Sequence, residues 1–143
     1  MKIAFILPSL ANKGPIVFTK YLIEGLKEKV DYIEVFYFKN IVELDLDVPT
    51  SQISFFKKLN FDSFDIVHTT MIKADLYSWW NKKNIDKKAV ISVHNYLVED
   101  LKFLYKPIKA KVFTFLWKVS LISTNHIIVS SEDQLNYYKK LLG

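Results

Sequence analysis

Short apolar runs alternate with segments of helical spacing along the whole chain. Apolar, β-branched or aromatic runs predict strands at residues 2–7, 32–38, 64–70, 88–95 and 126–130. Amphipathic spacing predicts a first helix with Pro15 in its first turn, then helices at 73–84, 97–105, 107–123 and 131–142. This alternation predicts an α/β fold, a Rossmann-like open, mainly parallel sheet with helices on both faces.

Two segments fit the alternation less well. Residues 40–52 are polar and broken by Pro49, which predicts a loop with at most a short strand. Residues 53–59, ISFFKKL, predict a short helix.

Two apolar segments raise the question of secretion or membrane insertion. Ile3–Leu7 is too short for a signal peptide, and Pro8 ends it without a small-residue cleavage site. Residues 112–130 contain Lys118, which costs about 2.5–3.5 kcal/mol near the centre of a bilayer. We therefore expect a helix followed by a buried strand there rather than a membrane span.

The length of 143 residues predicts a single domain over residues 1–143, and 50% hydrophobic residues exclude a disordered chain. The absence of cysteine excludes disulfides and thiolate chemistry. A net charge of +5 favours an anionic partner, without choosing among nucleic acid, anionic lipid and a phosphorylated small molecule.

Ligands of open α/β sheets bind beyond the carboxyl ends of the strands, so residues at those ends are candidates for chemistry. His68 ends the run FDIVH and His94 ends AVISVH. Each histidine alone is equally well explained as a strand cap, but two at equivalent ends favour hydrogen bonding or proton transfer to a ligand. His126 begins a strand on the opposite edge and is expected to be structural.

Gly14 lies in the loop that enters the first helix. Backbone N–H groups at a helix N-terminus attract phosphate, and glycine allows a close approach. An ordinary strand-to-helix turn explains the loop equally well. The loop lacks both the dinucleotide fingerprint and the P-loop ending, which disfavours a dehydrogenase or a nucleotide hydrolase.

Five lysines between Lys102 and Lys118 are interleaved with aromatic residues. Such a segment suits the interface of an anionic membrane. The favoured alternative is an apolar stripe that faces the core, with the lysines in solvent. Nucleic acid is not expected as a partner, because no recognition module is readable.

The order of MKIAFILPSL, KGP, FDIVHTTMIKADL, AVISVHN and NHIIVSSEDQ resembles the N-terminal, acceptor-side domain of the GT-B glycosyltransferases, in the large retaining group known as glycosyltransferase family 4. The resemblance implies one half of a GT-B fold and transfer from a nucleotide-sugar donor to a surface-glycan or glycolipid acceptor. It implies a catalytic role for His94 beside the reacting sugar. It places three residues at the donor diphosphate, Lys13, Gly14 and Pro15, and three in substrate binding, His68, Asn95 and Ser130.

Two departures from that family pattern matter. Lys13 stands where many members have a glycine, and the sequence stops at Gly143, before the second domain that binds most of the nucleotide. We therefore expect half an enzyme, inactive alone, whose partners are a second domain or subunit, a nucleotide sugar and a glycan or lipid-linked acceptor. No metal or other cofactor is implied, and the expected location is the cytoplasm, peripherally on the inner face of the membrane.

Two other functions stay open. One is a non-catalytic module that recruits a partner to an anionic membrane through Lys102–Lys118. The other is a small phosphate-binding domain unrelated to sugar transfer.

Overall fold

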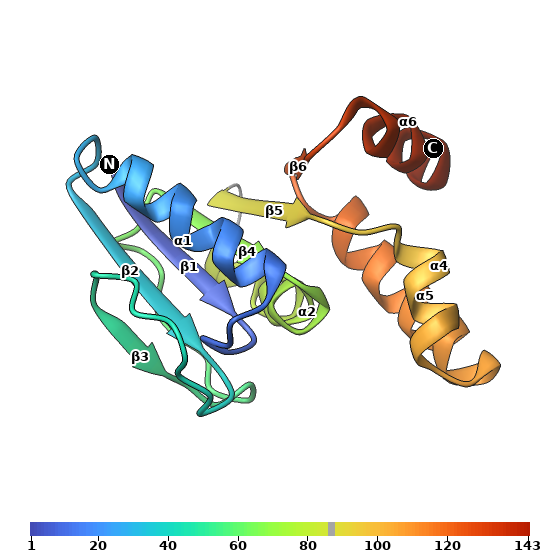
Figure 1. Ribbon diagram of the computed structural model, residues 1–143, viewed down its shortest axis with the longest axis horizontal. Coiled ribbons are helices and arrows are strands. Elements are labelled where there is room, and N and C mark those ends of the chain that lie inside the picture. Colours follow the sequence, from blue (N-terminus) through green and yellow to red (C-terminus); the bar gives the residue numbers. More distant parts are fainter. Residues whose placement is uncertain (86–87) are drawn as a thin grey trace.

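The computed structural model describes residues 1–85 and 88–143. Six parallel strands form one sheet in the order β3-β2-β1-β4-β5-β6 (Figure 1). The direction in which strands are added changes between β1 and β4, because β2 and β3 lie on one side of β1 and β4, β5 and β6 lie on the other. The predicted Rossmann-like sheet is thereby confirmed.

The element bounds follow the predicted pattern closely. The strands are β1 Lys2–Leu7, β2 Tyr32–Tyr37, β3 Thr50–Gln52, β4 Ile66–Thr70, β5 Ala89–Val93 and β6 His126–Val129. The helices are α1 Gly14–Leu26, α2 Ile72–Trp80, α3 Lys82–Ile85, α4 Leu97–Leu104, α5 Pro107–Ile122 and α6 Glu132–Leu142.

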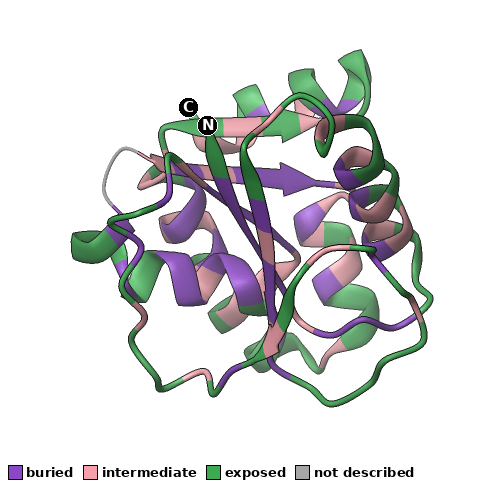
Figure 2. Ribbon diagram, turned by 90° about the vertical axis from the view of Figure 1, so that its left-hand side faces the viewer, coloured by how far each residue is buried: buried purple, intermediate pink, exposed green. Residues whose placement is uncertain are grey.

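Strand β1 is covered on both of its faces. Alternate side chains point to opposite faces of a strand, so Ala4 and Ile6 join a cluster with Ala74 and Tyr77 of α2, whereas Phe5 joins a cluster with residues of α1. In Figure 2 the central strands are purple over most of their length and the outer helix faces are green. Burial on both faces explains why the strand sequence is continuously apolar.

A third cluster packs α4, α5 and α6 around β5. Helices α4 and α5 lie side by side at the end of the molecule farthest from β3 (Figure 1). The buried side of α5 is formed by Ala110, Trp117 and Leu121.

Three local predictions are corrected. Residues 53–59 form no helix, because Phe55 instead stacks on Trp80 at 5.8 Å and packs edge-on against Tyr77. The helix predicted at 73–84 is interrupted at Asn81, whose side-chain amide donates to the carbonyl of Tyr77 at 2.9 Å. The strand predicted as buried, β6, alternates between exposed and half-buried residues because it is the last strand of the sheet.

The segment 112–130 divides into the end of α5 and β6, as expected. Over residues 1–85 and 88–143, no helix has both the length and the apolar character needed to cross a membrane.

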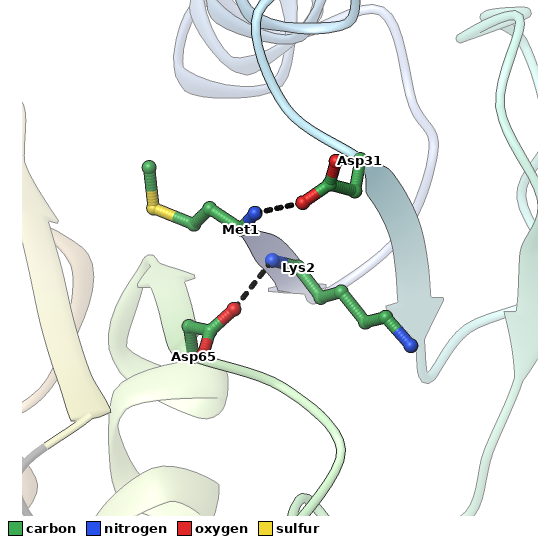
Figure 3. A network of polar contacts seen from close by, with 4 residues as sticks. All are labelled: Met1, Lys2, Asp31 and Asp65. Atoms are coloured by element: carbon green, nitrogen blue, oxygen red, sulfur yellow. Dashed lines mark hydrogen bonds and ion pairs between the residues drawn. The ribbon is translucent and has the colours of Figure 1, made fainter.

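At the amino edge of the sheet, polar groups pair with one another (Figure 3). The terminal amine of Met1 forms an ion pair with Asp31, and the Lys2 backbone N–H donates to the Asp65 carboxylate at 2.7 Å. Hydrogen bonding to the terminal amine lowers the pKa of Asp31. These contacts join the start of β1 to the loops that precede β2 and β4.

Candidate functional site

A pocket of about 420 Å³ opens at the carboxyl edge of the sheet. Its walls are the N-terminus of α1, the segments that follow β4 and β5, and facing residues of α4 and α5. Four of the predicted site residues line it: Lys13, Pro15, His94 and Asn95. Segments separated by about 80 residues therefore meet where the fold class places its ligands.

His94 directly follows β5 and is half-buried. Its ring packs edge-on against Phe18 of α1, with 4.7 Å between ring centroids. Burial lowers the pKa of His94, so the ring is neutral at neutral pH. Its buried Nε2 has no hydrogen-bond partner among the described residues.

The N-terminus of α1 forms the opposite wall. Lys13 is the exposed N-cap residue, and its carbonyl accepts from the N–H groups of Ile16 at 3.0 Å and Val17 at 2.9 Å. A Cβ added at Gly14 would meet no atom within 4 Å. Packing therefore does not require glycine here, and the open space beside the helix start is compatible with a close approach by an anion.

His68 lies within β4 and not at its end, so its expected position is wrong. The strand continues through Thr69 and Thr70, whose β-branched side chains suit the sheet. His68 is buried behind the pocket, and its Nε2 shares a 2.7 Å hydrogen bond with the hydroxyl of Ser92, a pocket residue. Burial, with a smaller contribution from His94, lowers the pKa of His68 to about 4.

A buried carboxyl group supports another wall. Asp75 accepts hydrogen bonds from the Thr69 hydroxyl at 2.6 Å and from the indole N–H of Trp117 at 2.8 Å. Trp117 lines the pocket, so Asp75 links β4, α2 and the pocket wall on α5. Burial raises the pKa of Asp75 to about 7, against the opposing effect of the two hydrogen bonds.

The segment that follows β5 is held by α6. The Tyr138 hydroxyl donates to the carbonyl of Asn95 at 2.6 Å and accepts from the N–H of Leu97 at 3.3 Å. The Tyr137 hydroxyl accepts from the N–H of Val98 at 3.1 Å. The two tyrosines thus satisfy free N–H groups at the start of α4 and fix the backbone beside His94.

Ser130 is not brought to the pocket. Its hydroxyl donates to the side-chain carbonyl of Gln134 at 2.8 Å, while Ser131 caps α6 by accepting from the N–H of Gln134 at 3.1 Å. Both serines serve the start of α6.

Sequence reasoning missed several residues of the pocket. Ser92 precedes His94 by two positions on the same strand, and the two-residue period of strands was the signal that would have found it. Met71 also lines the pocket and has φ 73° and ψ 153°, a conformation that strongly favours glycine. No local pattern marks Met71, Asp100 or Trp117. Among residues 1–85 and 88–143, no three histidine or acidic side chains gather as a metal site.

Comparison with known proteins gives limited matches. No family model matches the chain. Two Escherichia coli proteins, each described as O-antigen biosynthesis glycosyltransferase WclY, are 25% identical to it over 146 residues, or 96% of this chain and 41% of theirs. The chain thus spans about two fifths of the length of these curated relatives.

Two solved structures share the architecture. Sucrose-phosphate synthase from Thermosynechococcus elongatus matches 99% of this chain and 45% of its own, with a TM-score of 0.74 and 13% identity. A putative NAD-dependent epimerase/dehydratase from Bacillus halodurans matches 89% of this chain and 68% of its own, with a TM-score of 0.54 and 14% identity. The chain therefore has the Rossmann-like architecture that forms one half of a GT-B fold.

Proposed function

We propose that this chain is the acceptor-side domain of a retaining glycosyltransferase that moves a sugar from a nucleotide-sugar donor to a surface-glycan or glycolipid acceptor. The observation that carries the proposal is the carboxyl-edge pocket, which combines Lys13 and the start of α1 with His94. The similarity to an O-antigen glycosyltransferase supports sugar transfer, and the match to sucrose-phosphate synthase supports the fold.

The α1 wall binds the donor diphosphate. Breaking the bond between the sugar and the diphosphate leaves an electron pair and negative charge on the departing phosphate. The positive end of the α1 dipole and the ammonium of Lys13 stabilise that charge as it develops. Gly14 leaves room for the phosphate oxygens, whereas Pro15 in the first turn has no backbone N–H group to donate to them.

His94 contacts the transferred sugar near its reacting carbon. Its neutral ring lines the pocket and contacts a sugar hydroxyl there, with Phe18 packed edge-on against the ring. Asn95 follows on the same segment and binds the acceptor or donor sugar beside it.

His68 is a positioning residue in this account. Its burial prevents direct contact with an acceptor, and it acts through the hydroxyl of Ser92. Ser130 binds substrate only if Gln134 releases it, so we assign it no role in the pocket.

The complete transferase contains a second domain or subunit that binds the nucleotide. The matched relatives are more than twice as long as this chain, which supports that part of the proposal. The isolated chain is inactive, because its pocket supplies contacts to only one side of the donor. No metal or cofactor is needed beyond the nucleotide sugar.

A second candidate is a non-catalytic module recruited to an anionic membrane. The observation that favours it is the exposed apolar and basic surface of α4 and α5, which the transferase chemistry does not use.

The test is a sugar-transfer assay with a panel of nucleotide sugars and lipid acceptors, run on this chain and on the product of its full reading frame. We expect transfer by the longer product only. His94→Ala lowers kcat/KM about 100-fold while circular dichroism stays native, as expected for loss of a transition-state contact.

The matched control is His126→Ala, which removes an exposed histidine at the amino edge and leaves kcat/KM unchanged. Full activity of His94→Ala contradicts the proposed site. Absence of transfer by the longer product and by every candidate partner complex contradicts the transferase and favours the recruitment module.

A further inference from the structure

Helices α4 and α5 expose large apolar side chains that the core does not use. Phe103 is 91% exposed, Ile108 81% and Phe115 65%, with Leu104, Val112 and Ile122 also exposed. We call these six residues, with Lys102, Lys111 and Lys118, the α4–α5 face. The buried side of α5 consists of other residues, Ala110, Trp117 and Leu121, so the exposed apolar side chains form a second apolar surface of that helix.

A groove of about 560 Å³ runs between the two helices. Its floor and walls are mostly apolar, with contributions from Val98, Pro107, Ala110 and Phe115. Lys102 of α4 and Lys111 and Lys118 of α5 line the same groove. Residues seven positions apart lie on the same side of a helix, so Lys111 and Lys118 flank Phe115 along one line.

The charge of the molecule is concentrated on this segment. From Leu101 to Ser131 the sequence has five lysines and no acidic residue. The remaining 15 lysines are balanced by the 15 acidic residues of the rest of the chain, so this segment accounts for the whole net charge of +5. The acids that flank this segment lie in first turns of helices: Glu99 and Asp100 in α4, where Glu99 accepts from Tyr137 and Asp100 lines the pocket, and Glu132 and Asp133 in α6.

Apolar side chains flanked by lysines match the chemistry of an anionic bilayer surface. Apolar groups enter the boundary between headgroups and acyl chains, and each lysine near an anionic surface contributes about 1 kcal/mol. Lysine side chains place their stems along the apolar groups and their ammonium groups among the headgroups. A protein partner would explain the apolar groups, but it would not by itself explain why three lysines line the groove beside them.

We propose that the α4–α5 face docks on an anionic lipid bilayer, with Phe103, Ile108 and Phe115 inserted and the lysines of the groove against the headgroups. Helix α4 separates the groove from the carboxyl-edge pocket, and Leu104 belongs both to the exposed apolar set and to the pocket lining. Docking therefore brings the pocket beside the headgroups. On the proposed transferase function, the acceptor is then a glycolipid held in that membrane.

The experiment is flotation of this chain, and of the longer product, with vesicles of phosphatidylcholine alone or of equimolar phosphatidylcholine and phosphatidylglycerol. We expect flotation with the anionic vesicles that weakens as salt is added. The variant Ile108→Asp/Phe115→Asp abolishes it, and Phe56→Asp, which alters an 80% exposed side chain elsewhere, leaves it intact.

Charge is tested separately from apolar contact. The variant Lys102→Glu/Lys111→Glu/Lys118→Glu lowers vesicle affinity about 100-fold or more, at roughly 1 kcal/mol for each lysine removed and a further loss from each new carboxylate. Lys29→Glu/Lys39→Glu/Lys57→Glu changes three exposed lysines elsewhere by the same net charge and retains most of the affinity. All of these positions are exposed or half-buried, and circular dichroism checks that each variant folds.

The proposed docking surface is contradicted if the wild-type chain does not bind anionic vesicles. It is contradicted too if the two triple-lysine variants lose the same vesicle affinity. A third contrary result is binding by this chain but not by the longer product, because another part of that product then covers the face. Transfer to a water-soluble acceptor without vesicle binding contradicts the docking proposal and supports the transferase function. Vesicle binding without sugar transfer contradicts the transferase function and supports the docking proposal.

Discussion

Polar groups are paired with one another at the amino edge of the sheet and are partly unpaired at the carboxyl edge. At the amino edge, the Met1 amine pairs with Asp31 and the Lys2 N–H donates to Asp65, all close to solvent (Figure 3). At the carboxyl edge, His94 Nε2, His68 Nδ1 and Thr70 Oγ1 are buried without hydrogen-bond partners among the described residues.

This difference indicates that the amino edge serves stability and the carboxyl edge serves ligand binding. Buried polar atoms in folded proteins are usually satisfied, and each exception needs an explanation such as a missing ligand. Of the four such atoms among the described residues, three belong to β4 and to the residue after β5, near the edge where the fold class binds its ligands, and the fourth is Asn81 Oδ1 after α2. The titratable groups differ in the same way, because Asp31 is held ionised by its partner whereas burial favours the neutral forms of His68 and Asp75.

The largest expected effect concerns Asp75. Its pKa is raised to about 7 in the folded chain, so between pH 4 and 7 the folded state holds a proton that the unfolded state has released. This group therefore lowers stability as pH rises through that range. Asp75→Asn removes the effect. As pH rises from 4 to 7, the free energy of unfolding of the variant should increase relative to that of wild type by about 1.4 kcal/mol per pH unit.

Urea unfolding of both proteins across this range measures the difference. Asparagine keeps an acceptor for Trp117, and the Thr69 hydroxyl can rotate to accept from its amide. A constant difference from pH 4 to 8 would show that Asp75 titrates normally.

His68 should act in the opposite direction. Its pKa is lowered to about 4, so between pH 4 and 6.5 the unfolded state binds a proton that the folded state does not. His68 therefore makes stability rise with pH in that window, by about 1.4 kcal/mol per unit. His68→Gln removes this rise, so its free energy of unfolding should fall relative to that of wild type by about 1.4 kcal/mol per pH unit from pH 4 to 6.5, and that of His126→Gln should not. Equal curves for His68→Gln and wild type would refute the assignment.

Tyr138→Phe tests the support of the segment beside His94. The substitution leaves the buried N–H of Leu97 and the carbonyl of Asn95 without their partner, at an expected cost of about 1–2 kcal/mol in the free energy of unfolding. The control, Tyr21→Phe, removes a hydroxyl from a 66% exposed ring and should be neutral. Equal stability of both variants in urea would show that α6 does not hold this segment.

The smallest effect is expected at the amino edge. Asp31→Asn removes an exposed ion pair, and such pairs contribute little in salt. The lowered pKa of Asp31 means that its contribution is present above the unfolded pKa and is lost as pH falls through the folded value. We expect a small fall in the urea midpoint at pH 7 and low salt that vanishes in acid. A large fall at high salt would contradict the comparison of the two edges.

The strands and most helices were predictable because the spacing of their apolar residues follows which side chains are buried. Residues 2–7 are continuously apolar because β1 is covered on both faces, and Pro15 marks the first turn of α1. The helix predicted at residues 53–59 was wrong because the aromatic side chain of Phe55 packs against Tyr77 and Trp80 of α2.

The site was only partly predictable. Strand topology placed His94 and Lys13 at one edge, because the carboxyl ends of parallel strands meet there. His68 was misplaced because it ends the apolar run FDIVH, whereas the predicted strand 64–70, like β4, continues through Thr69 and Thr70. The contact between Asp75 and Trp117 joins residues 42 positions apart on two helices, and neither local spacing nor composition encodes it.

The chain contains three histidines, one at the pocket, one behind it and one at the amino edge, and they allow a direct test of the two edges. The measurement is an NMR titration of their ring signals with uridine diphosphate and guanosine diphosphate. We expect at least one of these ligands to shift the His94 signals most, to shift those of His68 less through Ser92, and to leave those of His126 unchanged. Shifts confined to His126, or no shift at His94 with either ligand at saturation, would contradict the claim that the carboxyl edge is the binding edge.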